Sequence, residues 1–139
     1  MTAGSGHRRA AEALAEAAVA VFPGATVECR DILTLTSPTF RTFYAWLYLF
    51  LVRHLPWLWK FSYQWLDVTW MYRIFQPMRH AWNLWIGRGA VRWLSQAAYD
   101  VVVVTHFFPA DLCSAGRRAG WLKASLVVVV TDWHPHRFW

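Results

Sequence analysis

Residues 99–106 read Tyr-Asp-Val-Val-Val-Val-Thr-His, and residues 124–132 read Ala-Ser-Leu-Val-Val-Val-Val-Thr-Asp. Each stretch contains a short, continuous apolar run with β-branched residues, which is typical of a buried strand in a parallel sheet. Between the two runs, residues 107–120 have the composition of a loop followed by a helix. This order of strand, helix and strand predicts an α/β fold with a parallel sheet.

Both predicted strands end in polar residues. Thr105-His106 closes the first strand and Thr131-Asp132 closes the second. In open parallel sheets, ligands bind at the carboxyl ends of the strands. We therefore expect His106 and Asp132 to line one crevice, together with His7 from the beginning of the chain.

The chain begins with a small glycine loop, Met1-Thr-Ala-Gly-Ser-Gly-His7, that opens into a helix. Gly4 and Gly6, which flank Ser5, accept positive φ and lack the Cβ atoms that would keep a ligand away from backbone N–H groups. The helix is alanine-rich, has an apolar face, and stops at Pro23-Gly24. Its N-terminus would direct unpaired N–H groups and a positive dipole end toward an anion or a developing oxyanion.

His7 is the candidate catalytic residue of this loop. Imidazole titrates near physiological pH, so a neutral histidine can act as a general base toward a hydroxyl nucleophile. One alternative is a turn with a solvated histidine, because the motif is short and weakly specific. Dinucleotide binding is a minor alternative: Asp31, near the end of a strand predicted at 26–33, would contact a ribose, but the third glycine of that fingerprint is absent.

Residues 34–98 form a segment that is both aromatic and basic. The segment contains seven basic residues and one acidic residue, which accounts for the formal net charge of +6 of the whole chain. Tryptophan and tyrosine suit the headgroup level of a membrane, and arginine and lysine are attracted to anionic lipid. We therefore expect a helical insertion that docks on an anionic membrane surface.

Two alternatives remain for this segment. In the first, its aromatic residues pack a helical subdomain, with the arginines solvated outside. Nucleic acid ranks below lipid as a partner, because the apolar run at 43–52 carries too little charge for a nucleic-acid groove. That run is also about half of the ~20 residues that a membrane-spanning helix needs, so no transmembrane helix is expected. Three helices are predicted, with breaks near Pro56, Gln76-Pro77 and Gly87-Arg88-Gly89.

The chain has 139 residues, enough for one domain with a core, and two cysteines. Cys29 and Cys113 cannot make a disulfide framework, so we expect two buried thiols and a reducing compartment. Near the end of the chain, Asp132, His134 and His136 would share one face of an extended segment, as metal ligands do. This pattern suggests a metal-dependent hydrolase as a rival function. Because Pro135 disturbs the strand and nothing completes a ligand shell, we expect no metal, and a loop in which His134 shapes the acceptor side of the crevice.

Three motifs, GSGHRRAAEALAEA at 4–17, DVVVVTHFFPADL at 100–112 and VVVVTDWHPHRFW at 127–139, together resemble a known family. They are similar, in this order, to the N-terminal domain of the monogalactosyldiacylglycerol synthase and processive diacylglycerol glucosyltransferase family. The resemblance implies a GT-B glycosyltransferase with two Rossmann-like domains, inversion at the sugar, and neither metal nor cofactor. His7 matches the histidine that would deprotonate the acceptor hydroxyl of diacylglycerol, which then attacks a nucleotide sugar such as UDP-galactose or UDP-glucose.

The resemblance also implies parts that this sequence lacks. A buried first strand should precede the glycine loop, and a C-terminal domain should hold most of the nucleotide-sugar contacts. We therefore expect residues 1–139 to be a fragment, the acceptor-side Rossmann-like domain of a hexosyltransferase, inactive alone and peripheral on the cytoplasmic face of the membrane. A stand-alone membrane or lipid-binding module without catalysis is the alternative.

Overall fold

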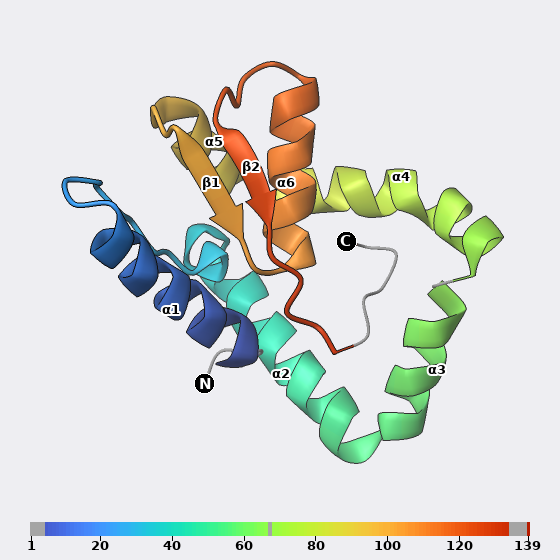
Figure 1. The fold of residues 1–139 in the computed structure, drawn as a ribbon. Coiled ribbons are helices and arrows are strands. Elements are labelled where there is room, and N and C mark those ends of the chain that lie inside the picture. Colours follow the sequence, from blue (N-terminus) through green and yellow to red (C-terminus); the bar gives the residue numbers. More distant parts are fainter. Residues whose placement is uncertain (1–4, 67, 134–138) are drawn as a thin grey trace.

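The computed structural model of the chain describes residues 5–66, 68–133 and 139 (Figure 1). The elements are, in order, α1 (Ser5–Val21), the 3-10 helix η1 (Ile32–Leu35), α2 (Pro38–His54), α3 (Pro56–Leu66), α4 (Thr69–Ile86), α5 (Arg88–Gln96), β1 (Val101–Val104), α6 (Phe107–Arg118) and β2 (Ser125–Val128). Within these residues the fold is mostly helical, with one parallel sheet of two strands. It agrees with the predicted α/β class.

β1 and β2 are the two strands predicted from the valine runs. They pair in parallel, with Val101 opposite Ser125 and Val104 opposite Val128, and α6 connects them. The expectation that both strands are buried is wrong for one face of the sheet, where Val101 and Val103 are 52% and 47% exposed. The physical reason is that the helices that pack on the sheet, α5 and α6, meet the residues that alternate with these two valines.

The core lies between the covered face of the sheet and the helices α5 and α6. Its buried members are Leu94, Val104, Ala110, Cys113, Leu122 and Ala124. A second buried cluster, made of Ile86, Ala90, Phe108 and Leu112, joins α4, α5 and α6 and packs against η1. Cys113 is a buried thiol as expected, and burial raises its pKa to about 11. Cys29 is exposed, contrary to the prediction.

The strand predicted at 26–33 does not form. Residues 25–30 are irregular and exposed, and Asp31 caps η1 by accepting a hydrogen bond from the N–H of Leu33 at 2.9 Å. Alternating sequence makes a strand only where a neighbouring strand supplies hydrogen bonds. The segment is instead held through side chains: the Tyr99 hydroxyl donates to Glu28 Oε2 at 2.5 Å, and the Arg30 guanidinium lies over the Trp93 ring.

The insertion between η1 and β1 contains four helices in place of the predicted three. Two predicted breaks are confirmed, since α2 ends before Pro56 and Gly87 separates α4 from α5. A third break, which was not predicted, lies between the end of α3 at Leu66 and the start of α4 at Thr69. The break at Pro77 is wrong, because Pro77 lies inside α4. A proline in a helix costs one hydrogen bond, and α4 has buried side chains on both sides of it, Met71 before and Ile86 after, whose packing offsets that loss.

The helices α2, α3 and α4 follow one another as an open arch that leaves the sheet region near η1 and returns to it at α6 (Figure 1). The arch therefore presents long helices with much of their surface uncovered. None of the described helices combines the length and the apolar character needed to cross a bilayer.

α1 begins earlier than predicted. Ser5 and Gly6 belong to its first turn instead of to a glycine loop, and Gly6 does not have a positive φ. Gly4 lies outside the described residues. At the end of the predicted apolar face of this helix, Val21 and Phe22 are exposed. α1 is therefore held mainly at its N-terminus, where His7 lies.

Candidate functional site

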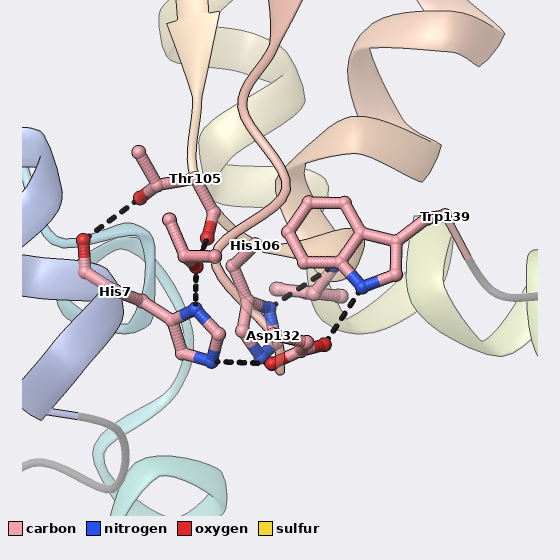
Figure 2. A network of polar contacts seen from close by, with 7 residues as sticks. His7, Thr105, His106, Asp132 and Trp139 are labelled. Atoms are coloured by element: carbon pink, nitrogen blue, oxygen red, sulfur yellow. Dashed lines mark hydrogen bonds and ion pairs between the residues drawn. The ribbon is translucent and has the colours of Figure 1, made fainter. Parts of the chain in front are cut away.

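His7, His106 and Asp132 come from three distant parts of the chain and meet beyond the carboxyl ends of β1 and β2 (Figure 2). His7 Nε2 lies 3.5 Å from Asp132 Oδ1. The His7 and His106 rings make an edge-to-face contact, with 4.7 Å between their centroids. The three side chains that the sequence assigned to one crevice are thus direct neighbours.

Two threonines at the strand ends hold His7 in place. The Thr105 hydroxyl donates a hydrogen bond to the backbone oxygen of His7 at 2.9 Å. The Thr131 hydroxyl donates to the backbone oxygen of Thr105, also at 2.9 Å, and it is hydrogen-bonded to Nδ1 of the His7 ring. The first turn of α1 is therefore fixed to both strands through its main chain and its side chain.

The sequence reasoning did not place these threonines in the site, although they hold its candidate base. The sequence does contain a pattern that marks them, because each threonine stands between a valine run and a predicted site residue, His106 or Asp132. Their role became visible only when the two strand ends and the start of α1 were placed beside one another.

His106 is the N-cap of α6, and its Nδ1 accepts a hydrogen bond from the N–H of Phe108 at 3.2 Å. Burial, and after it the nearby His7, lowers the pKa of His106 to about 4, although the Asp132 carboxylate acts in the opposite direction. The ring is therefore neutral at physiological pH. With Nδ1 accepting a hydrogen bond, its single proton is on Nε2.

Asp132 uses its two carboxylate oxygens for different partners. Oδ2 accepts a hydrogen bond from Nε1 of Trp139 at 2.7 Å, whereas Oδ1 faces His7 (Figure 2). The side chains of His7 and Asp132 are 23% and 24% exposed. The pair is thus partly screened from water and still open to a reactant.

The structure describes only some of the other predicted site residues. Ser5 and Gly6 lie in the turn that carries His7. Gly4 and His134 lie outside the described residues, as does His136 of the rival metal site. Within the described part of the chain, no group of three or more His, Cys, Asp or Glu residues could hold a metal ion.

An imidazole beside a carboxylate at a helix N-terminus can perform general acid–base chemistry. The imidazole takes a proton from a hydroxyl, and the carboxylate stabilises the imidazolium that results. The N-terminus of α1 adds a positive dipole end that favours developing negative charge nearby. The arrangement therefore suits the activation of a hydroxyl nucleophile.

A second polar cluster, which the sequence did not reveal, joins α4 to α6. Asp111 accepts hydrogen bonds from His80 Nδ1 at 2.9 Å and from Asn83 Nδ2 at 2.7 Å. Arg79 Nη1 lies 3.5 Å from the same carboxylate. Asp111 is largely buried, so this cluster fastens the end of the helical arch to the helix that His106 caps.

The family model for monogalactosyldiacylglycerol (MGDG) synthase matches residues 7–139. The matched range contains His7, His106 and Asp132, both strands and the helical insertion. No curated protein and no solved structure matches the chain significantly.

Proposed function

The chain belongs to the monogalactosyldiacylglycerol synthase family, as its N-terminal domain, and on that premise we propose that it is the acceptor-binding half of a GT-B glycosyltransferase. The reaction moves a hexose from a nucleotide sugar, UDP-galactose or UDP-glucose, to diacylglycerol. The configuration at the sugar is inverted, and the chemistry requires neither metal nor cofactor.

The contact between His7 and Asp132 is the observation that carries this proposal. His7 takes the proton of the acceptor hydroxyl as its oxygen attacks the anomeric carbon of the sugar, and the nucleoside diphosphate leaves with the bonding electrons. The Asp132 carboxylate, 3.5 Å from His7 Nε2, balances the positive charge that the imidazole gains. The acceptor oxygen loses its proton on one side and attacks the sugar on the opposite side. These two events need only His7, Asp132 and a bound sugar donor.

In the complete domain that we propose, the sheet is Rossmann-like and has more strands than the two described ones. One edge of β1 pairs with β2, and on one face of the sheet Val101 and Val103 are exposed. A further strand on the other edge of β1, leading into the turn before His7, would give residues 26–33 a strand neighbour. A second domain would supply most contacts to the nucleotide sugar.

We further propose that residues 34–98 place the site at the cytoplasmic surface of an anionic membrane, where diacylglycerol resides. Among the residues of the arch whose side chains the structure describes, six tryptophans are exposed: Trp46, Trp57, Trp65, Trp70, Trp82 and Trp85. A packed aromatic subdomain would bury such rings, so their exposure supports the membrane proposal. Diacylglycerol and anionic lipid are thus the proposed partners, and nucleic acid is not.

The test measures transfer of labelled hexose from UDP-galactose and UDP-glucose to diacylglycerol in vesicles, by the chain joined to its nucleotide-sugar domain. His7→Ala should lower turnover by about 10²-fold or more, and vesicle binding should be retained. The control is Arg9→Ala, because Arg9 is exposed on the same helix and should leave turnover nearly unchanged.

Two outcomes would contradict parts of this proposal. Unchanged transfer by His7→Ala would remove His7 as the base. Vesicle binding without transfer by the unmodified protein, with either sugar nucleotide, would instead support the alternative of a lipid-binding module without catalysis.

A further inference from the structure

We propose that Thr131 is a positioning residue that keeps the proton of neutral His7 on Nδ1 and leaves Nε2 free to accept a proton. The meaning of this arrangement for turnover rests on the proposed function. The hydrogen bonds on which the Thr131 assignment is based do not depend on the proposed function. The assignment and the proposed function can therefore be disproved separately.

The Thr131 hydroxyl has a single proton, and the direction of this proton decides which of its two neighbours accepts a hydrogen bond from it. The backbone oxygen of Thr105 can only accept a hydrogen bond, and it lies 2.9 Å from Thr131 Oγ1. The hydroxyl proton therefore points to Thr105. In its contact with Nδ1 of His7, the Thr131 oxygen can then act only as an acceptor, so Nδ1 must carry a proton.

The neighbouring hydrogen bonds hold the Thr131 hydroxyl in this direction. Thr105 is buried directly after β1, and the N–H of Val129 donates to the oxygen of Val104 at 2.8 Å, which holds the chain after β2 beside β1. The Thr105 hydroxyl is committed to the backbone oxygen of His7 at 2.9 Å. These bonds connect the Thr105 carbonyl, the Thr131 hydroxyl and the His7 imidazole in one hydrogen-bonded chain.

The direction of the Thr131 hydroxyl also determines the state of the other ring nitrogen of His7, Nε2. With a proton on Nδ1, neutral His7 has its lone pair on Nε2, at the edge of the ring that faces Asp132 at 3.5 Å. A proton that arrives at Nε2 is placed beside the carboxylate, so accepting it creates an ion pair. Nε2 is therefore the basic atom, and Asp132 acts once that atom is protonated.

The opposite tautomer would satisfy Asp132 at the expense of Thr131. If Nε2 carried the proton and donated it to Asp132, the lone pair of Nδ1 would face the lone pairs of the Thr131 oxygen. To relieve this repulsion, the hydroxyl would have to turn away from Thr105 and leave the oxygen of that buried residue without its hydrogen bond.

The experiment uses ¹⁵N-labelled chain and long-range ¹H–¹⁵N correlation spectra of the His7 ring, assigned by comparison with His7→Gln. The unmodified chain should show a protonated Nδ1 and an unprotonated Nε2. Thr131→Ser keeps the hydroxyl and should preserve this pattern. Thr131→Val removes the acceptor and should shift the ring mainly to the tautomer with the proton on Nε2.

A proton on Nε2 in the unmodified chain overturns the proposal, and this result does not depend on either Thr131 variant. An unchanged tautomer in a folded Thr131→Val chain, with β1 and β2 amide signals retained, also overturns it. In the protein with its nucleotide-sugar domain, Thr131→Val should lower kcat by about 10-fold or more with KM nearly constant, and Thr131→Ser should restore it. Absence of sugar transfer in the unmodified protein, with the expected tautomer, would remove the proposed function and leave this assignment intact.

Discussion

At the scale of single residues, His106 links the site to the stability of the fold. Its pKa of about 4 lies below the ordinary value of 6.5 because the ring is buried, so the folded state binds fewer protons between these two values than the unfolded chain. The contribution of neutral His106 to stability is therefore complete above pH 6.5 and is lost as the pH falls toward 4.

His106→Asn should make stability less dependent on pH. The asparagine amide oxygen can replace Nδ1 as the N-cap acceptor for Phe108, and it does not titrate. Between pH 7 and pH 5, the unmodified chain should lose about 2 kcal/mol more of its free energy of unfolding than the variant. Urea unfolding at both pH values measures this difference. Parallel pH profiles for the two proteins would show that His106 is not buried in its neutral form.

The site residues could be predicted to the extent that the sequence marks the ends of elements. His7 follows a glycine pair before a helix, and His106 and Asp132 follow valine runs, so general rules for helix termini and parallel sheets brought them together. Thr105 and Thr131 could not be assigned in this way. Their roles depend on the direction of hydrogen bonds between segments that only the tertiary structure places in contact.

At the scale of elements, the contact between α4 and α6 depends on Asp111. Removing this carboxylate by Asp111→Ala leaves His80 and Asn83 without the acceptor that they share, in a largely buried place. We expect a loss of about 3 kcal/mol in the free energy of unfolding. Asp111→Asn keeps one amide oxygen as an acceptor and should cost less. Equal losses for the two variants would indicate that packing, and not the polar cluster, fastens the arch to α6.

The close approach of η1 to α5 requires a glycine at position 89. A Cβ atom built on Gly89 would lie 2.2 Å from the backbone oxygen of Leu35, which cannot move without shifting η1. Gly89→Ala should therefore destabilise the chain by about 1–3 kcal/mol, although alanine favours helices. Thermal unfolding measures the effect, and Arg92→Ala on the exposed side of α5 is the control. A stabilised Gly89→Ala chain would contradict this packing.

The elements differ in how well sequence reasoning predicts them. The valine runs and α6 were predictable because their patterns are local and strong. The segment at 26–33 was not, since alternation predicts a strand only if a neighbouring strand is present. Pro77 was expected to end a helix, but the buried residues Met71 and Ile86 of α4 keep the helix continuous.

At the scale of the whole molecule, charge and exposed aromatic surface coincide on the helical arch. The chain has a formal net charge of +6, which equals the excess of seven basic residues over one acidic residue in 34–98. Five of the seven lie on the arch: Arg41, Arg53, Lys60, Arg73 and Arg79. Electrostatic attraction to anionic lipid weakens as salt screens it, whereas burial of tryptophan in the headgroup layer does not. The two contributions can therefore be separated by measuring binding at several salt concentrations.

We expect the chain to co-sediment with anionic vesicles at low salt and to lose most of this binding as the salt concentration rises about tenfold. Combining Trp57→Ser with Trp70→Ser removes two exposed rings of the arch, at 67% and 59% exposure, and should weaken the binding that persists at high salt. Phe22→Ser is the matched control, because Phe22 is 64% exposed but lies after α1, outside the arch. If Phe22→Ser weakened binding as much as the double variant, the chain would adhere through general apolar exposure. If the unmodified chain did not bind anionic vesicles at low salt, the arch would have another role, and the acceptor would have to reach His7 without help from a docked membrane surface.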